Sequence, residues 1–157
     1  MMKDIFTVAS YICNRYEKEF GERIDEMKLH KLLYFTQREC LIQTEQPMFE
    51  EQFEGWRLGP VAPMIRKPYQ EDSFDKEISD KDVTEYLDVL DYVFDNYAGE
   101  SSWSLSLLSH GEICWKSSRK GFAPNASSNV PIPTENIRRD ADRMKERRAF
   151  LTPRGQI

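Results

Sequence analysis

The apolar residues near the start of the chain recur every three or four positions, which is the spacing of a helix with one buried face. Asp4 stands just before the first series and suits an N-cap. That series comprises Ile5, Val8, Ala9, Ile12 and Tyr16. A second series follows Asp25 and comprises Leu29, Leu32, Leu33, Thr36 and Cys40. A further stripe runs beside it, formed by His30, Tyr34, Gln37 and Leu41, so we expect the second helix to be central and contacted on more than one side.

The pattern changes around residues 47–62, where prolines and glycines alternate with aromatic and β-branched residues. These residues predict a short β-hairpin or an extended turn. Pro63 suits the first turn of a helix, but Pro68 removes a backbone donor, so we expect little more than one turn there.

Helical spacing returns between Ser79 and Tyr97, which predicts one long amphipathic helix, with Gly99 as a left-handed residue after its end. A shorter helix should follow, capped by a serine at 101 or 102 and stopping near residue 111. Residues 117–133 have the composition of a surface loop, and a last helix is expected over about 134–150. The predicted fold is therefore mainly α, a compact multi-helix single domain over residues 1–157.

Length and composition agree with one folded domain. The chain has 157 residues, of which 39% are hydrophobic, enough for a core without metal or disulfide. Its net charge of -5 argues against a surface that binds nucleic acid as a whole. Three cysteines suit a reducing compartment, and neither a signal peptide nor a membrane span is apparent, so we expect a cytoplasmic protein away from membranes.

Several kinds of chemistry lack the residues they need. Two histidines and no Cys-x-x-Cys predict no metal site, and no glycine-rich phosphate motif is present, so no cofactor is expected. His110 with Cys114 or His30 could form an enzyme site, but no orienting group or oxyanion site can be named. We therefore do not expect an enzyme; buried cysteine and histidine more often serve packing and hydrogen bonding.

The C-terminal residues 136–157 are locally basic, with seven basic against three acidic residues. A solvated helix face is the simpler interpretation. The alternative is a nucleic-acid-binding regulatory protein in which Arg138, Arg139, Arg143 and Arg147 contact phosphates.

Three motifs in series carry more information. The first is Met27 to Phe35, read MKLHKLLYF; the second is Phe53 to Val61, read FEGWRLGPV; the third combines Leu105, Leu108-Ser109-His110 and Trp115. Together they resemble the Panacea antitoxin domain, the SocA-like antitoxin family, which has a KLQKLLYY helix, an F-x-A-W-x-x-GPV turn and an L-x-x-x-(S/T)-H-x-x-x-x-W segment in this order. The resemblance covers about residues 4–115. Departures are His30 for Gln, Gly55 for Ala, and Pro68 within a usually longer helix; they concern geometry near the turn.

The resemblance implies a mainly helical antitoxin of a bacterial or phage toxin–antitoxin system that neutralises a separately encoded toxin. The resemblance allows two mechanisms: the antitoxin blocks the toxin directly, or it delivers the toxin to a cytoplasmic protease. The sequence does not choose between them, nor between a monomer and a homodimer of this chain. The partner is thus expected to be a cognate protein toxin.

The same motifs supply candidate partner-binding residues, because Trp and Arg contribute strongly to interfaces. Trp56 and Arg57 stand beside the stiff Gly59-Pro60 turn. The full candidate set is Trp56, Arg57, Gly59, Pro60, Arg66, His30, Tyr34, His110 and Trp115. For Tyr34, Trp56 and Trp115 the alternative is packing of the turn onto the central helix, and for His110 a structural hydrogen bond.

Overall fold

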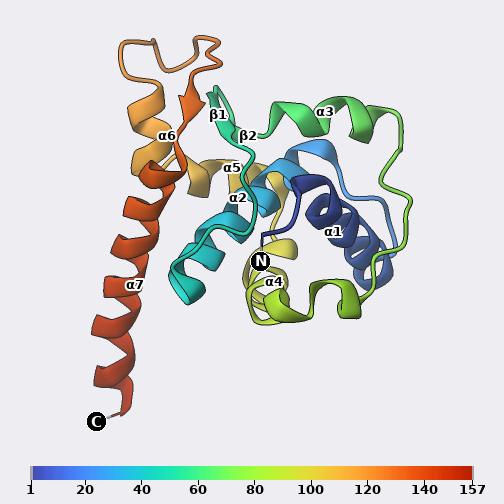
Figure 1. The fold of residues 1–157 in the computed structure, drawn as a ribbon. Helices are drawn as coiled ribbons and strands as arrows, with labels where there is room; N and C mark the ends of the chain where they lie inside the picture. Colours follow the sequence, from blue (N-terminus) through green and yellow to red (C-terminus); the bar gives the residue numbers. More distant parts are fainter. Residues whose placement is uncertain (1, 157) are drawn as a thin grey trace.

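A long helix, α2 (Glu26–Thr44), passes through the middle of the molecule (Figure 1). The computed structural model describes residues 2–156, with side chains described to residue 151. The Asp25 carboxylate caps α2 by accepting a hydrogen bond from the Lys28 N–H at 2.8 Å. Every residue from Lys28 to Ile42 is buried, so the prediction of a central helix contacted on several sides is confirmed.

Helix α1 (Ile5–Phe20) packs on α2 and buries the predicted apolar series. Asp4 is its N-cap and accepts from the Thr7 N–H at 2.8 Å. Gly21, with a φ of 77°, ends the helix in the left-handed conformation that glycine tolerates best.

Strands β1 (Phe53–Trp56) and β2 (Gly59–Val61) form the predicted hairpin, with Trp56 opposite Gly59. A third strand, β3 (Pro131–Ile132), pairs antiparallel with β1, giving the order β2-β1-β3. This strand was not predicted. It is two residues long and its partner strand lies about half the chain away in sequence, so no local pattern reveals it.

Helix α3 (Pro63–Gln70) is longer than predicted. Pro68 lies inside it, yet the helix continues to Gln70 because one missing donor costs a single hydrogen bond and the end is held from outside. The Tyr69 hydroxyl donates to the Ile24 carbonyl at 2.7 Å, and the Arg23 guanidinium lies 4.0 Å from the Tyr69 ring centroid.

The single helix predicted over 79–97 is wrong. The segment consists of a 3₁₀ helix, η1 (Asp80–Tyr86), an α-helix, α4 (Leu87–Val93), and a π-helical turn, η2 (Phe94–Ala98). Val83 leaves helical geometry with φ −129° and ψ 25°, while the Tyr11 hydroxyl donates to the Asp80 carboxylate at 2.9 Å and holds the first part against α1. Gly99 is right-handed, with φ −78°, contrary to expectation.

Three helices complete the chain: α5 (Ser102–Ser109), α6 (Ile113–Ser118) and α7 (Thr134–Gln156). Ser101 caps α5 by accepting from the Ser104 N–H at 3.0 Å. Helix α7 lies along one side of the molecule, and α1 lies on the opposite side of α2 (Figure 1). The fold is therefore mainly α with one small antiparallel sheet, as predicted. No helix within residues 2–156 is long and apolar enough to cross a membrane.

Candidate functional site

A cleft of about 710 Å³ opens between the start of α2, the β1–β2 turn and α3. The loop that precedes β3 closes its remaining side. Its lining residues are Glu26, Met27, His30, Lys31, Trp56, Arg57, Leu58, Val61, Arg66, Ser127, Ser128 and Asn129. The structure thus brings together four of the predicted residues, His30, Trp56, Arg57 and Arg66, around one concave surface.

Trp56 and Arg57 lie where the hairpin turns. The Trp56 indole N–H donates to the Glu54 carboxylate at 2.9 Å, and the Arg66 guanidinium carbon stands 5.2 Å from the indole ring centroid. Trp56 is half-buried, whereas Arg57 is exposed. The cleft therefore has an aromatic wall with a cation stacked on it and a second cation at the rim.

His30, Glu26 and Arg66 form a connected group in the cleft wall. The backbone N–H of Ala62 donates to Nδ1 of His30 at 3.2 Å, which leaves Nε2 as the protonated nitrogen facing the Glu26 carboxylate at 3.0 Å. Nε of Arg66 lies 3.0 Å from the same carboxylate. Burial is the main reason that the pKa of His30 falls to about 4, so its imidazole is neutral at pH 7.

Lys31 borders the cleft but is only 1% exposed. Its ammonium donates to the Pro60 carbonyl at 3.0 Å. Burial lowers the pKa of Lys31 to about 7, and no carboxylate of the described residues offsets that effect.

Gly59 and Pro60 shape the turn above this lysine. Gly59 has a φ of 116°, and a Cβ placed on it would meet Cε of Lys31 at 2.8 Å. Only glycine fits both the backbone conformation and the space. Both residues are buried.

Trp115 and His110 lie behind the turn and do not line the cleft. The Trp115 indole N–H donates to the Trp56 carbonyl at 2.8 Å, and its ring stacks on His110 at 4.2 Å between centroids. Burial lowers the pKa of His110, and the nearby Lys31 adds to the effect. These two rings hold the backbone of the turn in place.

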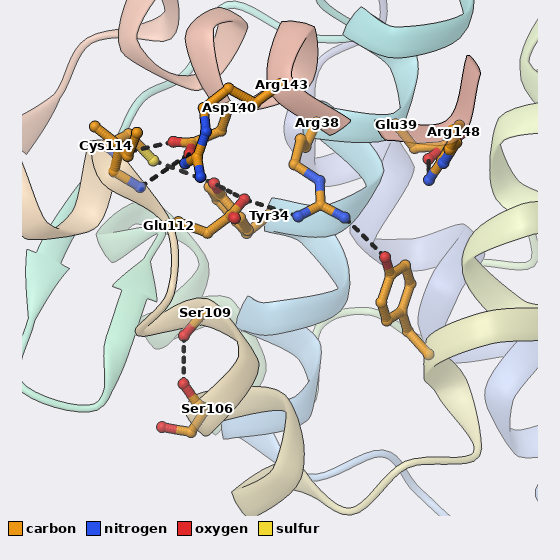
Figure 2. A network of polar contacts seen from close by, with 12 residues as sticks. Tyr34, Arg38, Glu39, Ser106, Ser109, Glu112, Cys114, Asp140, Arg143 and Arg148 are labelled. Carbon is orange, nitrogen blue, oxygen red and sulfur yellow. Dashed lines mark hydrogen bonds and ion pairs between the residues drawn. The ribbon is translucent and has the colours of Figure 1, made fainter. Parts of the chain in front are cut away.

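Tyr34 is fully buried in a polar network between α2, α6 and α7, which Figure 2 shows from close by. Its hydroxyl donates to the Glu112 carboxylate at 2.7 Å, and the Arg38 guanidinium binds the same oxygen at 2.8 Å. The Asp140 carboxylate accepts from the backbone N–H of Cys114 at 2.8 Å. Tyr34 therefore joins helices inside the molecule and lies away from the cleft.

The two residues considered for an enzyme site take different partners. The Cys114 sulfur lies 3.1 Å from the Tyr34 hydroxyl, and burial raises the pKa of its thiol well above the ordinary value. His110 stacks on Trp115 instead. Within the described residues, no group of three or more His, Cys, Asp or Glu side chains is placed to hold a metal ion.

The four arginines proposed for phosphate contacts do not form one set. Arg138 donates to the Glu45 carbonyl at 2.6 Å and pairs with Glu135 at 3.1 Å. Arg139, Arg143 and Arg147 are exposed and recur every four residues along α7. The last two line a smaller cleft of about 380 Å³, which also contains Arg38 and Glu112.

Sequence reasoning missed two groups of residues. Glu26 directly precedes the first motif, and Lys31 lies within it. Their charge on a helix with apolar residues on several sides could have indicated that they are buried or paired. The other group is an exposed apolar patch on α5, formed by Trp103, Leu107 and Leu108, with Trp103 58% exposed. Serines stand between these apolar residues in the sequence, so the segment does not look like an exposed apolar surface.

Comparison with known families assigns the chain to one of them. The family described as "Antitoxin SocA-like, Panacea domain" matches residues 29–116, more than half of the chain. The chain belongs to this Panacea family. The matched segment contains α2 from Leu29, the hairpin and Trp115, whereas α1 and α7 of this Panacea domain lie outside it. No curated protein and no solved structure matches the chain.

Proposed function

We propose that the protein is an antitoxin of a bacterial or phage toxin–antitoxin system that neutralises a separately encoded protein toxin by binding to it. Membership of the SocA-like antitoxin family supports this role. The observation that carries the proposal is the cleft, because Trp56, Arg57 and Arg66 present an aromatic ring and two guanidinium groups around one hollow. The protein acts in the cytoplasm, without a cofactor, by binding rather than catalysis.

The candidate residues divide by role within this proposal. Trp56, Arg57 and Arg66 contact the toxin, with His30 in the wall beside them. Gly59 and Pro60 set the shape of the turn. Tyr34, His110 and Trp115 act through the position of α2 and the turn, since their contacts lie inside the molecule.

The whole chain, residues 1–157, is proposed to act as one such domain. A cytoplasmic protease that receives the bound toxin and a homodimer of this chain remain further partners of the proposal. The mass of the purified complex separates a homodimer from a simple pair, and the half-life of the toxin in cells tests delivery to a protease.

The decisive experiment expresses the neighbouring gene from an inducible promoter, with and without this protein supplied from a second plasmid. Growth arrest by the neighbour alone and rescue by this protein are expected. A harmless neighbour that does not co-purify with this protein would contradict the proposal.

Trp56→Ala should weaken capture of the toxin by about 2 kcal/mol or more, because truncation removes the aromatic wall of the cleft. Trp103→Ala is the matched control, since Trp103 is an exposed tryptophan on α5, outside the cleft. Affinity is measured by titration calorimetry, and circular dichroism checks that both variants fold. Loss of binding in Trp103→Ala alone would move the interface to the α5 patch.

A second candidate function is nucleic-acid binding through α7. The observation in its favour is the spacing of Arg139, Arg143 and Arg147, which are exposed at intervals of four residues. Arg138 contributes less to such a face, because its guanidinium is already bound to Glu135 and Glu45.

A further inference from the structure

Lys31 is a buried cation without a matching anion in the described structure. Its ammonium carries three donors, and the Pro60 carbonyl accepts one of them at 3.0 Å. Two other buried charges are paired with an opposite charge, Arg38 with Glu112 at 2.8 Å and Glu39 with Arg148 at 2.8 Å. Lys28 and Arg119 have only neutral oxygen partners, but each makes two or more hydrogen bonds where Lys31 makes one. A buried charge is normally paired, because an isolated one loses its hydration without compensation.

The cleft that Lys31 borders has an excess of positive charge. Arg57 and Arg66 stand at its rim, and His30 is held neutral. Glu26 is the acidic residue of the lining, and its carboxylate is already occupied by His30 and Arg66 at 3.0 Å each. An anion entering the cleft therefore meets two guanidinium groups, the buried Lys31 amine and one carboxylate that is already paired.

The size and form of the cleft favour an acidic group on a protein over a nucleic-acid strand. Strands are bound along rows of exposed cations, whereas Lys31 is a single buried amine in the lining of a cleft. The half-buried Trp56 lines the same cleft, and its ring offers a contact for an apolar partner residue next to such an acidic group.

We propose that Lys31 is the receptor for a carboxylate of the protein partner, an Asp or Glu side chain or a chain terminus, which enters the cleft beside Trp56 and pairs with the ammonium. In the partner-bound state the carboxylate neutralises Lys31, and Arg57 and Arg66 orient the flanking chain. The inference rests on the proposed toxin-binding function for the identity of the partner, but the anion site itself does not require it.

The first test uses N-acetyl-aspartate amide as the probe and N-acetyl-asparagine amide as its neutral match. The titration of Lys31 is followed by NMR of the lysine Cε in protein labelled with ¹³C-lysine. We expect the acidic probe, at tens of millimolar, to raise the pKa of Lys31 by at least one unit and the neutral probe to leave it unchanged, because an adjacent anion favours the charged ammonium. No response, or an equal response to both probes, would overturn the proposal.

The second test measures affinity for the neighbouring gene's product. Lys31→Met should weaken binding at least tenfold. Lys28→Met is the matched control: Lys28 is also buried on α2, but its ammonium binds the Tyr16 hydroxyl and the Ala98 carbonyl, away from the cleft. Lys31→Met should melt at or above the temperature of the natural protein, because replacing an unpaired buried charge by an apolar side chain of similar volume removes a desolvation cost.

The outcomes separate the two proposals. A wild-type protein that fails to rescue growth contradicts the antitoxin function, and the aspartate probe still decides the anion site. A toxin that binds wild-type and Lys31→Met proteins equally overturns the carboxylate receptor while the function stands. Binding of an oligonucleotide that depends on Lys31, without a response to the aspartate probe, would assign the site to phosphate and also overturn the proposal.

Discussion

His30 shows how one side chain on α2 can be both structural and sensitive to pH. Its Nδ1 accepts from the Ala62 N–H at 3.2 Å, and its Nε2 faces Glu26 at 3.0 Å, so the buried ring is satisfied only when neutral. The pKa falls from 6.5 to about 4 in the folded protein. The unfolded state therefore binds a proton more readily, and the stability that His30 contributes is present above pH 6.5 and lost as the pH falls toward 4.

His30→Gln tests this link. A glutamine can accept from Ala62 and donate to Glu26 without titrating, so the fold is expected to persist. Between about pH 7 and pH 5 the natural protein should lose about 2 kcal/mol more unfolding free energy than the variant. Urea unfolding at the two pH values measures the difference. Equal losses would show that His30 is not the titrating group; Glu26, whose pKa is also lowered, acts at lower pH.

Residue roles were only partly predictable from the sequence. Trp56, Arg57, Arg66 and His30 were singled out and do meet at one cleft, because the start of α2, the hairpin turn and α3 converge there. Lys31 was not singled out, although it lies between two motif residues. Its burial depends on the hairpin that covers it, and sequence spacing does not show which helix face a hairpin covers.

At the scale of elements, α6 begins with help from α7. Its own N-cap residue, Glu112, makes no capping bond, because its carboxylate is engaged by Tyr34 and Arg38. Asp140 of α7 takes over and accepts from the N–H groups of Ile113 at 2.9 Å and Cys114 at 2.8 Å. It is 3% exposed, so water cannot replace it.

Asp140→Ala should therefore lower the free energy of unfolding by about 2 kcal/mol, the upper end of the range for losing a helix cap. Asp142→Ala, an exposed aspartate on the same helix, should change it by less than about 0.5 kcal/mol. Thermal and urea unfolding measure both values. Equal effects of the two substitutions would show that the contact with α6 does not stabilise the fold.

Elements with regular spacing were predicted well, and those that depend on distant contacts were not. Helices α1 and α2 and the Asp4 cap of α1 follow directly from local pattern. The division of residues 80–98 into three helical types arises from Val83 and from the anchor between Tyr11 and Asp80. β3 forms by pairing with Phe53 and Glu54 of β1, which lie far from it in sequence.

For the whole molecule, charge is distributed unevenly. The net charge is -5, yet residues 136–157 hold seven basic and three acidic residues. One of these basic residues makes a contact within the protein: Arg148 donates two hydrogen bonds to the buried Glu39 carboxylate, at 2.8 and 2.9 Å. The row Arg139, Arg143 and Arg147 is exposed, as is Lys145.

We expect this row to bind a DNA or RNA oligonucleotide only non-specifically, with a Kd weaker than about 1 μM at physiological salt. Fluorescence anisotropy between about 50 and 200 mM salt measures it, because phosphate contacts release counterions and weaken steeply over that range. Arg143→Ala with Arg147→Ala is the test variant. Tighter binding that this pair of changes abolishes would favour the second candidate function.

The loop of residues 119–130 forms a wall of the cleft that lies outside the segment matched by the family. Arg119 is buried and holds this loop by donating to the Gly55 carbonyl at 3.1 Å and the Ala123 carbonyl at 3.2 Å. Ser127, Ser128 and Asn129 then form one wall, and they lie beyond the segment matched by the family, whereas the rest of the lining, apart from Glu26 and Met27, lies inside it. Substitutions at residues 127–129 therefore change one wall of the cleft while leaving α2 and the hairpin as they are.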